Sequence, residues 1–249
     1  MMESNHMVRK SPKITWQSRA AATLAAVAIL LLSVVAGADE AGQDTNADLS
    51  AEDFAERVQH FYGQTEDFQA GFLQSYTDVA AGQTKQSRGR VYFKKPGMMR
   101  WDYYDPRDDD RRDRVLVSDG SMFWIYEFEY QQVFRQCLGD SQLPTALRFL
   151  MGQGDLLEEF EVELADESTA QSPVLELTPK EPTSAYRMLR FELDPETYQV
   201  SKTTIFDPYG NTNAIDFRGI RVNRNLSASS FEFEVPEGAR ELNPQKRCD

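Results

Sequence analysis

Few residues in this 249-residue chain are of the types that commonly catalyse reactions or bind metals. The histidines are His6 and His60, and the cysteines are Cys137 and Cys248. Zinc sites and Ser/His/Asp triads depend on histidine, and the patterns GxxxxGK[ST], HExxH and GxSxG do not occur. Among 40 acidic residues, chance pairs are common, so scattered Asp and Glu do not by themselves indicate an acid–base pair. We therefore expect a protein that is not an enzyme and that has no metal site and no cofactor, with His60 at a surface or boundary position.

The two cysteines make one disulfide possible, but the sequence does not decide whether it forms. An oxidising compartment would permit a bond between Cys137 and Cys248. Cys248 is the second-last residue of a polar tail, so the sequence does not show where it lies. Both a bridge and two free thiols remain possible at this point.

The first 38 residues have the pattern of a secretory signal peptide. Four basic residues precede an uncharged Ala/Leu/Val run at 20–35, and Ala36-Gly-Ala38 is a typical cleavage site. An uncleaved anchor is the alternative, because the apolar run approaches the length that crosses a bilayer. No cysteine follows the run directly, so an N-terminal lipoprotein is not expected. We predict cleavage after residue 38, a flexible lead at 39–48, one domain at 49–240 and a polar tail at 241–249, in an exported protein.

Net charge narrows the possible partners. Residues 1–38 hold four basic residues and one acidic residue, which leaves 23 basic and 39 acidic residues and a net charge of −16. Such a chain is repelled by nucleic-acid phosphates and anionic lipid surfaces. The charge therefore predicts no nucleic-acid binding and favours apolar ligands or basic protein patches.

Most of the chain has the alternating pattern of antiparallel strands. Residues 90–126 hold four short β-branched and aromatic segments separated by Pro-Gly, Asp-Pro and Asp-Gly. Alternation places Met99, Trp101 and Tyr103 on one face and residues such as Met98 on the other. Residues 115–117 and 122–126 are apolar on both faces, so we expect both faces to be covered there. The mixed-charge run 107–114 is expected to be a solvated loop.

Two or three helices are expected beside the strands, and two of them can be located. Ser50 is a candidate N-cap, and Phe54, Val58 and Phe61 follow it at helical spacing as one apolar stripe. Spacing alone allows either an ordinary packed helix or a lid. Residues 143–152 form a second short helix, with Pro144 in its first turn. Period-two segments then continue to Phe231, Phe233 and Val235 without a helical crossover, which predicts an antiparallel sheet of about eleven strands.

A curled sheet of this size either closes around its own side chains or stays partly open beneath a cover. Its pattern does not decide between a solid core and a hollow that holds a lipid. The candidate lining residues are large and flat, or lie on the second helix: Phe68, Phe72, Trp101, Tyr103, Trp124, Tyr126, Leu147 and Leu150.

Two motifs carry a family resemblance. Residues 93–101 read Phe-Lys-Lys-Pro-Gly-Met-Met-Arg-Trp, and residues 117–126 read Val-Ser-Asp-Gly-Ser-Met-Phe-Trp-Ile-Tyr. Together with residues 69–74 and 231–238, they resemble the LolA family of periplasmic lipoprotein carriers. The resemblance implies an incomplete antiparallel β-barrel covered by a helical lid. It implies a monomer that takes lipoproteins from the inner-membrane transporter LolCDE to the outer-membrane receptor LolB.

The resemblance also implies roles for individual residues. Lys95 stands where the family has an arginine that holds the lid shut, and lysine keeps the charge but not the planar fork. Phe54, Val58 and Phe61 would belong to the lid helix. Met98 and Met99 stand where the family has an exposed apolar pair thought to meet the transporter. A protein of the same fold that binds another lipid or a lipoprotein-like stress signal is the alternative function.

Overall fold

The computed structural model describes residues 49–140, 154–242 and 248. The predicted signal peptide at 1–38, the lead at 39–48 and the second helix at 143–152 lie outside the described residues. Leu147 and Leu150 fall in the last of these segments, so their predicted place in the lining stays a prediction.

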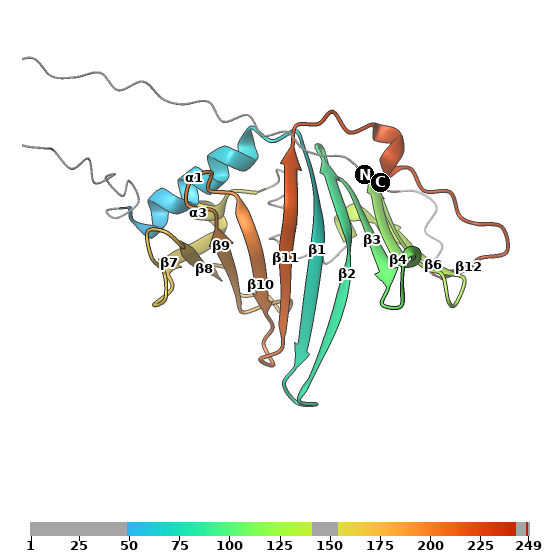
Figure 1. Cartoon of the computed structure of the whole chain (residues 1–249), viewed down its shortest axis with the longest axis horizontal. Coiled ribbons are helices and arrows are strands. Elements are labelled where there is room, and N and C mark those ends of the chain that lie inside the picture. The colour runs from blue at the N-terminus through green and yellow to red at the C-terminus, as the bar shows by residue number, and fades with distance from the viewer. Residues whose placement is uncertain (1–48, 141–153, 243–247, 249) are drawn as a thin grey trace, which may run out of the picture. The chain divides into compact units, whose positions relative to one another are not determined.

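One twelve-stranded sheet dominates the described part of the chain (Figure 1). The strands are β1 (Asp67–Asp78), β2 (Gln83–Lys94), β3 (Met98–Asp105), β4 (Asp108–Asp119), β5 (Met122–Glu127), β6 (Gln132–Cys137), β7 (Phe160–Leu164), β8 (Val174–Pro179), β9 (Met188–Leu193), β10 (Val200–Phe206), β11 (Thr212–Val222) and β12 (Arg240–Leu242). Their order is β12-β6-β5-β4-β3-β2-β1-β11-β10-β9-β8-β7. Because β12 and β7 are the two ends of this order, the sheet is open. This agrees with the incomplete barrel that the sequence analysis predicted.

Side-chain alternation decides what each face carries. Phe68 on β1 pairs with Phe93 on β2, and Phe93 pairs with Met99 on β3. Directly paired residues point to the same side of a sheet, so these three share one face, which we call the inner face. The opposite, outer face carries the residues between them, including Arg100 and Asp102.

The first helix, α1 (Ala51–Gly63), begins as predicted. Ser50 accepts a hydrogen bond from the Asp53 amide at 3.1 Å, and its own amide donates to the Asp53 carboxylate at 2.9 Å. This backbone hydrogen bond from Ser50 is the main reason why the pKa of Asp53 lies below its usual range. Phe54 and Val58 are buried, and α1 contacts the short helix α3 (Leu156–Glu159) and strands β7 and β8. Figure 1 shows α1 crossing the end of the sheet that contains these strands.

Two hydrophobic clusters occupy the two faces. Among the described residues, the inner cluster comprises 25 buried ones, contributed by α1, α3, Tyr186 and the strands. The outer cluster is small: Val115, Val117, Tyr126 and Val133 are buried, and Trp124, Phe233, Val235 and Ala239 pack against them. The prediction that β4 and β5 are covered on both faces is therefore confirmed.

Several sequence expectations about the strands were wrong. Most of residues 107–114 belongs to β4, because pairing with β3 satisfies the backbone of this charged run. The final predicted strand is instead the 3₁₀ helix η2 (Ala228–Phe231) followed by irregular chain, since Phe233 and Val235 pack over the outer face and do not extend the sheet edge. β12 lies partly in the predicted polar tail and pairs with β6 in parallel, so the sheet is not wholly antiparallel.

The C-terminal end of the chain is attached to the sheet. Cys137 ends β6 and forms a disulfide with Cys248, with the two Cα atoms 5.4 Å apart. The sequence allowed either a disulfide or two free thiols, and the structure contains the disulfide. Together with β12, it holds the C-terminal side of the segment that covers the outer cluster.

Candidate functional site

An aromatic group lies at the centre of the inner cluster. The ring centroid of Phe72 lies 4.9 Å from that of Trp101 and 5.0 Å from that of Tyr103. Phe68, which also belongs to the predicted lining, contacts Phe93 and Phe217 at 5.8 and 5.7 Å. The structure therefore brings together four of the predicted lining residues and fills the space between them with their own rings.

Glycine makes this packing possible. A Cβ atom at Gly89 would lie 2.0 Å from the Asp102 carbonyl oxygen and 2.7 Å from the Phe72 ring. No other residue type fits there without displacing backbone. Burial raises the pKa of the neighbouring Tyr103, and the Arg114 guanidinium lies 4.3 Å from the centre of its ring.

Sequence reasoning missed two members of this aromatic group. Phe93 and Phe217 are 2% and 6% exposed and contact the same rings. The signal that could have found Phe93 is its spacing from Val91 on one strand face. Phe217 lies far along the chain, and only the pairing of β11 with β1 brings it here.

Trp124 and Tyr126 do not belong to this group. Both pack on the outer face, where their rings lie 6.0 and 6.1 Å from that of Phe233. The expectation that they line the same hollow as Trp101 is corrected, because Trp101 pairs with Leu116 and Leu116 with Ile125. Ile125, between the two aromatic residues, is thus the one that faces inward.

The two methionines differ in the same way. Met99 is completely buried in the inner cluster, whereas Met98 is half-buried on the outer face. Their expected role as one exposed apolar pair is therefore corrected for Met99. Neighbouring strand residues point to opposite faces, so only Met98 has a side chain available to a partner.

Lys95 binds the end of α1. Its Nζ atom donates to the carbonyl oxygens of Tyr62 at 2.8 Å and Gly63 at 2.9 Å. These carbonyls belong to the last turn, where helix geometry leaves them without intrahelical partners and the helix dipole favours a cation. The contact is thus a direct link between the helical cover and the loop that joins β2 to β3.

Further contacts hold α1 along its length. The Tyr62 hydroxyl accepts a hydrogen bond from the Val200 amide at 3.2 Å, and burial raises the pKa of that hydroxyl far above its usual range. Gln59 accepts from the Leu156 amide at 2.9 Å and donates to Asp155. Val58 is completely buried, while Phe61, also predicted for the lid face, is half-buried.

A groove of about 510 Å³ runs beside the C-terminal half of α1. Arg57, His60 and Phe61 line one side of it, and Tyr198 and Asn223 line the other. The Arg57 guanidinium donates to the Tyr198 hydroxyl at 3.1 Å. His60 is exposed here, as expected for a surface histidine.

Within the described residues, no group of three or more His, Cys, Asp or Glu side chains is placed to hold a metal ion. None of the helices in this part of the chain is long and apolar enough to cross a membrane.

Comparison with known proteins gives consistent matches. Residues 63–234 match the family described as "Outer membrane lipoprotein carrier protein LolA". An outer-membrane lipoprotein carrier protein of Chromohalobacter salexigens is 28% identical over 74% of this chain and 84% of its own length. The protein of the same name from Azotobacter vinelandii is 28% identical over 84% of this chain and 95% of its own.

Similarity to solved structures is weaker. A conserved protein from Thermus thermophilus has a TM-score of 0.48 and 12% identity, over 77% of this chain and 98% of its own. A LolA superfamily protein from Nitrosomonas europaea has a TM-score of 0.42 and 13% identity, over 74% and 98%. The carrier names of the sequence relatives agree with the expectation that the chain is not an enzyme. With the family match extending over most of the sheet, this chain belongs to the LolA family of outer-membrane lipoprotein carrier proteins.

Proposed function

We propose that this chain shelters the acyl chains of lipoproteins against the inner face of its sheet while they cross the periplasm. The observation that carries the proposal is the combination of an aromatic inner cluster with a helical cover held by non-covalent contacts. The membership of the chain in a carrier family supports it.

Burial supplies the energy of such a carrier. Each methylene group removed from water contributes about 0.8 kcal/mol, so acyl chains with many methylenes do not cross water unescorted. The same energy means that release requires a receiving site that is at least as apolar. No bond is made or broken in this exchange, and no cofactor takes part.

Loading requires the cover to move. The rings of the inner cluster are in mutual contact, so acyl chains need space that opens when α1 separates from the sheet. Lys95 is the proposed latch of this movement, because its ammonium group donates to two carbonyl oxygens at the end of the helix. Met98, on the outer face beside the latch, is the proposed contact to a LolCDE-type transporter, and a LolB-type receptor would accept the cargo. The protein would act as a monomer.

A photo-crosslinking experiment tests where the acyl chains bind. A benzophenone amino acid is placed at Phe61, in the half-buried part of the cover, and for comparison at Phe233, in the cover of the outer cluster. Both proteins are incubated with spheroplasts that release a radiolabelled lipoprotein. We expect crosslinking to the acyl part at Phe61 and little at Phe233.

Equal crosslinking at both positions would contradict the proposed binding face. A complementary measurement identifies the lipid that co-purifies with the native protein by mass spectrometry. A triacylated lipoprotein supports the carrier function, whereas free phospholipid alone would indicate a binding protein for another lipid.

A further inference from the structure

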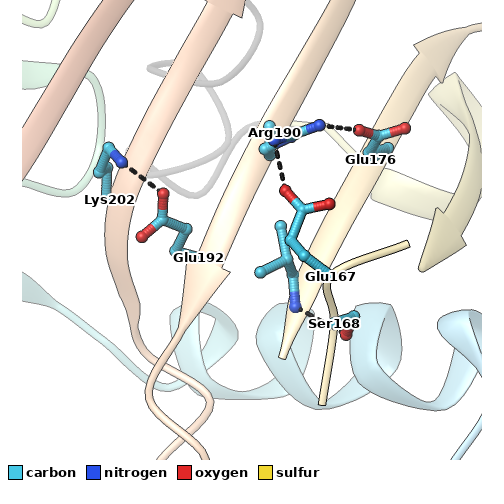
Figure 2. A network of polar contacts seen from close by, with 7 residues as sticks. Glu167, Ser168, Glu176, Arg190, Glu192 and Lys202 are labelled. Atoms are coloured by element: carbon cyan, nitrogen blue, oxygen red, sulfur yellow. Dashed lines mark hydrogen bonds and ion pairs between the residues drawn. The ribbon is translucent and has the colours of Figure 1, made fainter. Parts of the chain in front are cut away.

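The outer face of the sheet carries charges in two different arrangements. In the part formed by β8, β9 and β10, the cations are matched by carboxylates. Figure 2 shows Arg190 between Glu176 and Glu167, and Lys202 beside Glu192. The Arg190–Glu167 and Lys202–Glu192 pairs are 2.7 and 2.5 Å long. This half of the face is therefore internally neutralised.

In the part formed by β11, β1, β2, β3 and β4, cations are in excess. Six arginines lie there: Arg88, Arg90, Arg100, Arg112, Arg218 and Arg221. Arg100 and Arg112 share Asp102, at 3.0 and 3.6 Å, and Arg218 pairs with Asp216 at 3.0 Å. Among the described residues, no carboxylate forms an ion pair with Arg90 or Arg221. This local surplus contrasts with the net charge of −13 of the whole chain.

A bulge in β11 helps to concentrate these cations. Gln69 pairs with Arg221 and Gly71 with Arg218, so three steps along β11 correspond to two along β1. In a regular strand, residues three apart point to opposite faces, and the extra residue places both arginines on the outer face. Gly219, inside the bulge, has a φ of +60°, which glycine adopts without strain.

These arginines border a groove. A hollow of about 750 Å³ is lined on this face by Gly71, Leu73 and Tyr104, by four arginines and by one exposed carboxylate, Asp110. The arginines are Arg88, Arg90, Arg112 and Arg218. A second hollow of about 370 Å³ shares Gly71 and Arg90 with it and extends to Arg221. Because Gly71 has no side chain, the surface of the outer face is recessed between Arg218 and Arg90. We call the two connected hollows the arginine groove.

We propose that the arginine groove binds an extended, acidic segment of a partner protein. Arg112 on β4 and Arg218 on β11 are four strand spacings apart, about 20 Å. One phosphate or carboxylate cannot span this distance, whereas the side chains of an extended segment can contact the arginines in turn. Guanidinium groups match carboxylates with two parallel hydrogen bonds. A bilayer would meet the negative remainder of the chain as well as the groove, which disfavours an anionic membrane.

Peptide binding measures this directly. The probe is a fluorescein-labelled oligoglutamate peptide, and the readout is its fluorescence anisotropy with the full-length protein at low and high salt. We expect salt-sensitive binding that weakens about tenfold in the double variant Arg90→Gln/Arg221→Gln, since each lost charge contributes a fewfold at an exposed site. Lys85→Gln/Arg187→Gln removes the same charge outside the groove and is expected to bind like the parent. Lys85 lies on β2 as Arg90 does, but on the other face.

A second variant changes shape and leaves the charge unaltered. A Cβ atom at Gly71 would meet its nearest neighbour, the Arg218 carbonyl oxygen, at 3.6 Å, an ordinary contact. We therefore expect Gly71→Leu to fold and to block the groove, with a fall in affinity of about the same size. Equal losses in the control double variant, or unchanged affinity in both groove variants, would overturn the proposal.

Vesicles of phosphatidylglycerol in phosphatidylcholine distinguish binding of a lipid headgroup from binding of peptide carboxylates. Binding to the vesicles that depends on Arg90 and Arg221, without peptide binding, would overturn the proposal in favour of a lipid headgroup. The proposal does not rest on the carrier function, because peptide binding needs no lipoprotein. A failure in lipoprotein crosslinking therefore leaves this result standing, and the reverse also holds.

Discussion

The inner and outer clusters are both hydrophobic cores built on the same strands, but their covers are attached in different ways. The outer cover, which contributes Phe233 and Val235, continues into β12 and ends at the disulfide from Cys248 to Cys137. Helix α1 packs on the inner side over the end of the sheet that contains β7 and β8, and it is held by its apolar stripe and by hydrogen bonds such as those of Lys95. The outer cover is tethered by a disulfide, whereas α1 can separate from the sheet without the breaking of a covalent bond.

This difference indicates which face can exchange its contents. A disulfide tether restricts how far the outer cover can open, whereas a helix held by non-covalent contacts alone can separate in local equilibria. The inner face is also the larger and more aromatic of the two. The comparison therefore favours the inner face as the place where hydrocarbon is exchanged, and it can be tested at both covers.

The largest expected effect is at the centre of the inner cluster. Trp101 is 2% exposed and contacts four aromatic rings. Trp101→Ala is expected to lower the free energy of unfolding by about 3–5 kcal/mol, since it removes buried surface and leaves a cavity. Trp124→Ala, in the half-buried outer position, should cost about 1–2 kcal/mol. Urea denaturation of both variants measures this, and equal losses would contradict the ranking of the two clusters.

The next effect concerns the covalent attachment. The disulfide closes a loop with a sequence separation of 111 residues. Replacing both cysteines by serine should lower the free energy of unfolding by about 2–4 kcal/mol. Hydrogen exchange should speed up in β5 and β6 but not in α1. The parent protein with reductant is the control, and the prediction is wrong if α1 exchanges faster in either sample.

Lys95→Met is expected to have the opposite effect on hydrogen exchange, with a smaller loss in the free energy of unfolding. The substitution removes two hydrogen bonds to helix-end carbonyls, and we expect a loss of about 1 kcal/mol because the ammonium group is partly exposed. Amides of α1 should exchange faster, while those of β6 stay unchanged. Lys95→Arg should restore most of the protection, since it keeps a donor and a charge. Protection of α1 that is unaltered in Lys95→Met would remove the proposed latch.

The smallest effect is a pH dependence where α1 meets α3. The hydrogen bond from Gln59 is the main cause that lowers the pKa of Asp155, and burial partly opposes it. A carboxyl group with a lowered folded pKa contributes stability above its ordinary pKa of about 4, and this stability is lost as the pH falls. Asp155→Asn should therefore flatten the acid side of the stability curve. Denaturation midpoints at neutral and acid pH measure this, and parallel curves for variant and parent would exclude the contribution.

Much of this architecture could be predicted from local patterns. Ser50 and the stripe from Phe54 identified α1, and strict alternation placed Met99, Trp101 and Tyr103 on one face. The motif around Lys95 indicated the family and a contact between this residue and the cover. The helix and the strand face depend on residues close together in the chain, where backbone periodicity determines which side chains share a face. The contact of Lys95 was implied only by the family resemblance.

Tertiary structure decided the rest. Period two shows that Trp124 and Tyr126 share a face, but not which of the two apolar faces of β5 belongs to the inner cluster. The cover of the outer cluster, the partner of Cys137 and the neighbours of Phe217 all come from segments about 100 or more residues away in the chain. The bulge that places Arg218 and Arg221 together is likewise a property of strand pairing. Alternation is local information, whereas register, covering segments and charge surplus arise only when distant strands meet.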